Sequence, residues 1–66
     1  MGYRVKEIRE EKGMTQEELE KKSGVSRQTI SAIENNDKYQ AKVGTLMALA
    51  MALETTVDNL FFAKAV

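Results

Sequence analysis

The stretch TQEELEKKSGVSRQTISAIEN, from Thr15 to Asn35, decides the fold of this 66-residue chain. Thr15 is a good N-cap, and Glu18 three residues later completes a capping box, which predicts a helix that ends near Ser23. Gly24 then permits the positive φ that reverses the chain within a few residues. The first half of the stretch therefore predicts a short helix that ends in a tight glycine turn.

The second half of the stretch predicts another helix, from Arg27 to Asn35. Ser26 is its expected N-cap, and the spacing of Ile30 and Ile33 marks its buried face. Val25 is expected to pack into the angle between the two helices. The residues that we expect to build this helix pair are Leu19, Gly24, Val25, Ile30 and Ile33.

Three more helices are predicted outside this stretch, at about 3–12, 43–53 and 57–62, and polar residues 36–42 predict a loop. In the fourth helix, apolar residues recur at i, i+3, i+4 and i+7, and Met47 and Met51 widen the apolar face. Thr55 or Thr56 is expected to cap the last helix. The fold class predicted for residues 1–66 is all-α, a single domain of five short helices without strands.

The composition excludes most catalytic chemistry. The chain has no Cys and no His, so thiolate and imidazole nucleophiles, bases and metal ligands are absent, and we expect no enzyme, no metal and no cofactor or other small-molecule ligand. Ten basic and ten acidic residues give zero net charge, which argues against charge-driven binding by the whole surface. No apolar stretch approaches the ~20 residues that span a bilayer, and no signal peptide is evident, so a soluble cytoplasmic, nucleoid-associated protein is expected.

The outward face of the helix that begins at Arg27 carries hydrogen-bonding side chains. Arg suits bidentate contact with guanine and Gln suits adenine, while a small apolar side chain fits the methyl group of thymine. Two alternatives remain at this point: a helical corner that binds nothing, and ordinary solvated side chains. The residues predicted to contact bases are Arg27, Gln28, Ser31 and Ala32.

The chain resembles the lambda-repressor-like, Cro-type helix-turn-helix regulators, also called the xenobiotic-response-element family. The likeness runs from about Val5 to Phe61. It rests on four runs: Thr-Gln-Glu-Glu-Leu from position 15, Gly-Val-Ser from 24, Ile-Ser-Ala-Ile-Glu from 30, and Val-Asp-Asn-Leu-Phe from 57. The resemblance implies a sequence-specific transcriptional regulator, most simply a repressor, that binds a palindromic DNA operator as a homodimer. It also implies an internal ion pair between Arg9 and Glu34, whose alternative is two separately exposed charges.

Contacts with DNA phosphates are expected from two regions. The start of the second helix offers a side chain together with free N–H groups, and the family uses this position for phosphate. The loop before the fourth helix offers two cations and a phenol. The predicted phosphate-contacting residues are Gln16, Ser26, Thr29, Lys38, Tyr39 and Lys42.

The apolar end of the chain predicts the dimer interface, at Phe61, Phe62 and Val66, unless this tail folds back on its own domain. Met47 and Met51 either join that surface or pack against the first helix. Two other functions stay open: an antitoxin of the same fold, and a protein-interaction module that has lost DNA binding.

Three residues depart from the family pattern. Glu20 replaces a small residue at the contact between the two helices, so its side chain must bend toward water or alter the helix crossing. Asn36 stands where Gly is common after the third helix, and Asn tolerates the left-handed conformation that Gly adopts there. Gly44 stands in the entry to the fourth helix, where the family uses Pro and Ser.

Overall fold

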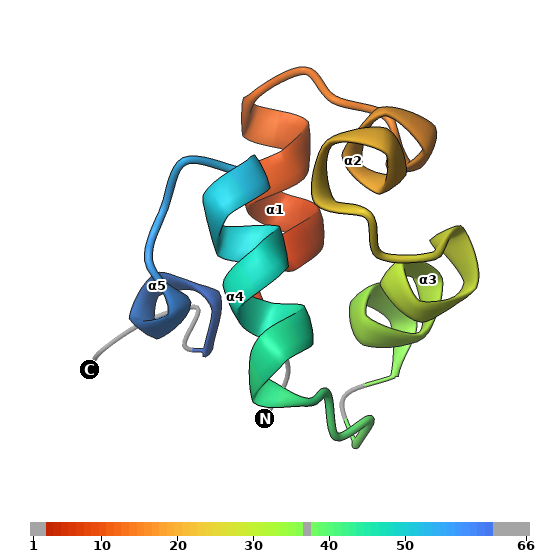
Figure 1. Cartoon of the computed structure of the whole chain (residues 1–66), viewed down its shortest axis with the longest axis vertical. Helices are drawn as coiled ribbons and strands as arrows, with labels where there is room; N and C mark the ends of the chain where they lie inside the picture. Colours follow the sequence, from red (N-terminus) through yellow and green to blue (C-terminus); the bar gives the residue numbers. More distant parts are fainter. Residues whose placement is uncertain (1–2, 37, 62–66) are drawn as a thin grey trace.

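The computed structural model describes residues 3–36 and 38–61, which form five α-helices and no strand (Figure 1). The helices are α1 (Val5–Glu11), α2 (Gln16–Ser23), α3 (Arg27–Asn35), α4 (Val43–Ala52) and α5 (Val57–Phe61). The all-α prediction is confirmed, and the predicted ends of the helices differ from these by two residues at most.

The α2–turn–α3 unit forms as its sequence predicts. The Thr15 hydroxyl accepts a hydrogen bond from the Glu18 N–H at 3.0 Å, and the Glu18 carboxylate accepts one from the Thr15 N–H at 2.9 Å. Gly24 ends α2 in the left-handed conformation, with φ at +76°, and its N–H donates to the Glu20 carbonyl. Ser26 then caps α3 by accepting from the Thr29 N–H at 3.2 Å. Local hydrogen bonds therefore set both helix starts and the turn between them.

One apolar core holds these helices together. Helix α2 packs against both α3 and α4, α4 also packs against α5, and α1 packs against α3 (Figure 1). Val25 is half-buried against this core, as predicted. The fully or almost fully buried apolar residues are Val5, Ile8, Leu19, Ile30, Ile33, Leu46, Leu49, Ala50, Leu53 and Leu60.

Two hydrogen bonds, one between backbone groups and one to a side-chain hydroxyl, join the start of α1 to distant parts of the chain. The Arg4 N–H donates to the carbonyl of Leu60 in α5 at 2.7 Å. The Tyr3 hydroxyl accepts from the Ala41 N–H at 3.3 Å, so it reaches the loop before α4. Helix α5 itself is capped by Thr56, whose hydroxyl accepts from the Asn59 N–H. These ties anchor both the short last helix and the loop.

Two local expectations are wrong. Met47 and Met51 do not widen the buried face of α4, since they are 53% and 77% exposed, because the core side of the helix is already filled by leucines. With Val43 they form an exposed stripe at i, i+4 and i+8. Asn36 is extended, with φ at −129°, so α3 ends without a left-handed residue. Among the described residues, the left-handed non-glycine residue is instead Glu54, with φ at +56°, after α4.

Candidate nucleic-acid interface

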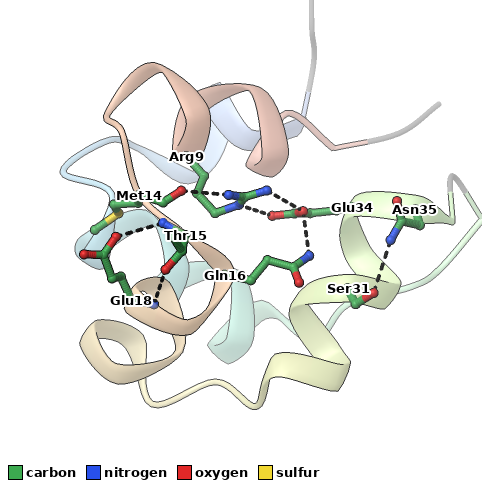
Figure 2. Close-up of polar contacts among 8 residues, drawn as sticks. All are labelled: Arg9, Met14, Thr15, Gln16, Glu18, Ser31, Glu34 and Asn35. Atoms are coloured by element: carbon green, nitrogen blue, oxygen red, sulfur yellow. Dashed lines mark hydrogen bonds and ion pairs between the residues drawn. The ribbon is translucent and has the colours of Figure 1, made fainter.

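The residues predicted to contact bases lie on the outer side of α3. The side chains of Arg27 and Gln28 are exposed and make no hydrogen bond with the described residues. Ser31 and Ala32 are half-buried, one turn further along. The Ser31 hydroxyl accepts from the Asn35 side-chain amide at 3.1 Å, which leaves its own proton to donate (Figure 2). The first turn of α3 thus carries the longest free donors.

The opposite side of α3 fixes how that face is presented. Ile30 and Ile33 are 0% and 1% exposed, and they anchor the helix against the core. At the helix start, the Ser26 hydroxyl also donates to the Thr29 hydroxyl at 2.9 Å. The position of the exposed donors is therefore set by buried apolar contacts and by a closed cap.

A buried polar network ties three helices together (Figure 2). The Arg9 guanidinium donates to both carboxylate oxygens of Glu34, at 2.7 and 3.1 Å, and to the Met14 carbonyl at 2.7 Å. Gln16 adds a hydrogen bond from its amide to the Glu34 carboxylate at 2.9 Å. The hydrogen bond with Glu34 raises the pKa of the Arg9 guanidinium, against the opposing effect of burial. The geometry of the predicted ion pair is present, and its side chains are 10% and 1% exposed.

Gln16 has a second role that the sequence did not indicate. Its amide nitrogen points inward to Glu34, although Gln16 also begins α2, where the first N–H groups of the helix have no partner within the helix. One amide proton and the side-chain oxygen stay available beside those N–H groups. The sequence carries no signal for this contact, because the contact depends on how α2 crosses α3.

The loop residues predicted to contact phosphate lie before α4. Lys38 and Lys42 are exposed, whereas Tyr39 is half-buried and packs against the core. Lys42 is the N-cap of α4, and this helix start has no side-chain cap. A cation beside uncapped N–H groups makes a local positive site on a chain of zero net charge.

A negative charge lies at the start of α3, in a contact that the sequence analysis did not predict. The Glu20 carboxylate accepts a hydrogen bond from the Arg27 N–H at 3.0 Å, a contact that neither of the two sequence alternatives included. Its position seven residues before Arg27, across a turn of known type, is the only sequence signal for this contact.

Other kinds of site find little support among the described residues. An open depression on α1 is lined by Tyr3, Lys6 and three glutamates, a setting that repels phosphate. No cluster of acidic residues among the described residues has the arrangement of a metal site. No helix in the described part is long and apolar enough to cross a membrane.

Comparison with known proteins identifies the family. The helix-turn-helix family matches residues 5–60, which include both helices of the unit described above and the core around them. The chain belongs to this family. The proteins of this family are Cro-type DNA-binding transcriptional regulators. The protein is therefore a DNA-binding regulator and not an enzyme.

Several relatives are similar over most of this chain. An uncharacterized HTH-type transcriptional regulator of Archaeoglobus fulgidus is 39% identical over 61 residues, covering 92% of this chain and 86% of that protein. The HTH-type transcriptional regulator SinR of Bacillus subtilis is 33% identical over 64 residues, 97% of this chain and 58% of SinR. The immunity repressor protein of Bacillus phage phi105 is 42% identical over 58 residues, 88% of this chain and 40% of that protein. The chain thus spans about half the length of the last two relatives.

The residues predicted to form the dimer interface are not among those whose side chains the structure describes. Phe62 and Val66 lie outside the described residues, as does the side chain of Phe61. The described part instead offers the stripe of Val43, Met47 and Met51 on α4.

Proposed function

We propose that the protein is a sequence-specific transcriptional regulator, most simply a repressor, which inserts α3 into the major groove of a palindromic operator. One observation carries this proposal: Arg27 and Gln28 are exposed at the start of a helix whose other side is held by Ile30 and Ile33. An α-helix fits the major groove, and these two side chains match the base-edge patterns of guanine and adenine.

Phosphate contacts are proposed to flank α3 on both sides. The start of α2 offers unpaired N–H groups beside Gln16, and the start of α4 offers Lys42 beside uncapped N–H groups. Lys38 adds a second cation in the same loop, and the Tyr39 phenol a further donor. These groups would fix the register of the helix, whereas the side chains on α3 would select the sequence.

The dimer is proposed because one such unit contacts only a few base pairs, and two half-sites one helical turn apart, ~34 Å, need two copies. Helix α4 contains no charged residue between Val43 and Ala52, so a second copy meets no unpaired charge there. We place the interface on Val43, Met47 and Met51, together with the apolar end of the chain at Phe61, Phe62 and Val66. Such a protein acts in the cytoplasm, on the nucleoid.

The test is selection of duplex DNA from a random pool, followed by titrations of wild type, Arg27→Ala and Gln28→Ala at one stated salt concentration. A two-fold symmetric site should emerge, and each variant should lose ~1–3 kcal/mol, mainly at one base position. Arg4→Ala removes a half-buried arginine from the start of α1 and should leave the selected site unchanged. Failure to enrich any sequence, even at low salt, would refute the operator proposal.

A second function is favoured by one observation, the exposed apolar stripe on α4. A protein that binds a partner protein, such as an antitoxin or an interaction module, also needs such a surface. Its test begins with the same DNA selection. If the wild-type chain enriches no DNA site but binds a partner protein stably, and Met51→Lys abolishes that binding, the protein is an interaction module.

A further inference from the structure

Glu20 links the end of α2 to the start of α3. Its carboxylate accepts a hydrogen bond from the Arg27 N–H at 3.0 Å, and its main-chain carbonyl accepts one from the Gly24 N–H at 2.8 Å. The side chain is half-buried, so it lies along the turn instead of extending into solvent. Glu20 therefore accepts hydrogen bonds from both ends of the turn that leads into α3, from Gly24 and from Arg27.

The first three N–H groups of α3 are largely satisfied from within the chain. Arg27 donates to the Glu20 carboxylate, and Thr29 donates to the Ser26 hydroxyl. Gln28 is the remaining one, and its N–H has no partner among the described residues. The end of the helix that ordinarily attracts phosphate is thus closed, and its partial positive charge is opposed by a full negative charge.

The other two helices near the proposed DNA surface are different at their starts. Helix α4 has no side-chain cap and begins at a lysine. Helix α2 is capped by Thr15, but Glu17 and Glu18 lie in its first turn, and the Glu18 carboxylate accepts from the Thr15 N–H. Among the three, only α3 has an acid from another helix bound to its first N–H. Phosphate is therefore favoured at the start of α4 and disfavoured at the start of the helix that carries Arg27 and Gln28.

We propose that Glu20 is a specificity-determining residue, which weakens phosphate binding at the start of α3 and so makes DNA affinity depend on base contacts by Arg27 and Gln28. The inference rests on the proposed docking of α3 in the major groove. In a non-specific complex, almost all affinity comes from contacts with phosphates, and no base contact keeps the start of α3 away from a phosphate. In a specific complex, base contacts hold the helix in place, so the repulsion between Glu20 and a phosphate changes the affinity less.

The size of the effect follows from the Coulomb interaction of one carboxylate with one phosphate. At a separation of ~7 Å and an effective dielectric constant of ~40–80, the repulsion weakens binding about threefold to eightfold. Screening by salt reduces this factor over a Debye length of ~10 Å at 0.1 M. The effect is therefore measurable at low salt and should fade as salt rises.

The experiment compares the full chain with Glu20→Gln, Glu20→Ala and Glu54→Gln. The Gln variant keeps an acceptor for the Arg27 N–H and removes only the charge, whereas the Ala variant removes both. Glu54 is exposed, follows the end of α4, and serves as a control for net charge. Affinities for the selected operator and for a duplex of unrelated sequence are measured at several salt concentrations, together with Tm.

Glu20→Gln should bind unrelated duplex about threefold to eightfold more tightly at low salt and the operator less than about twofold more tightly. The ratio of the two affinities should therefore fall, and the difference should shrink with salt, while Glu54→Gln matches wild type. An unchanged ratio in Glu20→Gln, with a lower Tm in Glu20→Ala alone, would make Glu20 a structural cap and overturn the inference. A wild-type chain that binds neither duplex would overturn the proposed function, and this inference with it.

Discussion

The buried ion pair between Arg9 and Glu34 makes a strong prediction about stability. Arg9→Met keeps a long apolar side chain but removes the guanidinium, which makes two hydrogen bonds to Glu34 and one to the Met14 carbonyl. The Glu34 carboxylate, 1% exposed, is then left with the amide of Gln16 as its only side-chain donor among the described residues. The variant therefore keeps a charge buried without its counter-charge.

Breaking a buried pair on one side costs ~3–5 kcal/mol, because the remaining charge is desolvated and unpaired. A chain of this length is stabilised by about 3–10 kcal/mol in total, at roughly 0.05–0.15 kcal/mol per residue. Arg9→Met should therefore lose about a third or more of the free energy of unfolding. At ~4–8 °C per kcal/mol, a loss of ~3–5 kcal/mol should lower Tm by about 12–40 °C.

The assay is thermal and urea unfolding followed by circular dichroism, with Glu34→Leu and the double variant completing a cycle. The double variant should be clearly more stable than Arg9→Met, because it no longer buries a lone carboxylate. Arg4→Met breaks the exposed pair with Glu7 at 3.2 Å and is the control, with a Tm close to that of wild type. A loss below ~1 kcal/mol for Arg9→Met, as for a surface pair, would refute the reasoning.

Three further predictions concern backbone, tether and charge. Gly24→Ala should cost ~1–2 kcal/mol by urea unfolding, because the φ of Gly24 is +76°, although a Cβ there meets nothing within 4 Å. Gly44→Ala, at an equally open position within regular α4, should stabilise the protein by ~0.5–1 kcal/mol. Equal effects of the two substitutions would contradict this account. Tyr3→Phe removes the acceptor for the Ala41 N–H and should speed amide exchange at Ala41, with unchanged exchange in α3 as the internal control. The raised pKa of Arg9 means that its stabilising charge is complete at acidic and neutral pH and is lost only at strongly alkaline pH; with no His in the chain, the free energy of unfolding should be nearly flat from about pH 6 to 9, and a steep slope there would show that another group titrates.

Most of the fold is local information and was therefore predictable. The capping box at Thr15, the glycine turn at Gly24 and the Ser26 cap each act within a few residues, and all three form as expected. Apolar spacing likewise predicted which sides of α3 and α4 face the core. What periodicity does not show is how many apolar residues the core can accept, so Met47 and Met51 were assigned to a buried face that was already full.

The candidate site was less predictable because part of it depends on contacts between helices. Exposure of Arg27 and Gln28 follows from their position opposite Ile30 and Ile33, which the sequence gives by helical geometry. The inward turn of Gln16 and the hydrogen bond from Arg27 to Glu20 depend instead on the crossing of α2 with α3. Sequence spacing alone does not specify that crossing closely enough to place a side-chain oxygen within hydrogen-bonding distance.

The side chains of Arg27 and Gln28 contribute almost nothing to holding the protein together. They are exposed and make no hydrogen bond with the described residues, while the support of their helix lies in Ile30, Ile33 and the Ser26 cap. Exposed substitutions of this kind usually change stability by less than ~0.5 kcal/mol. On the proposed docking of α3, mutation at these two positions would retarget the protein to a different DNA sequence without threatening its folding, so divergent copies of one ancestral gene would acquire separate operators through a few point mutations.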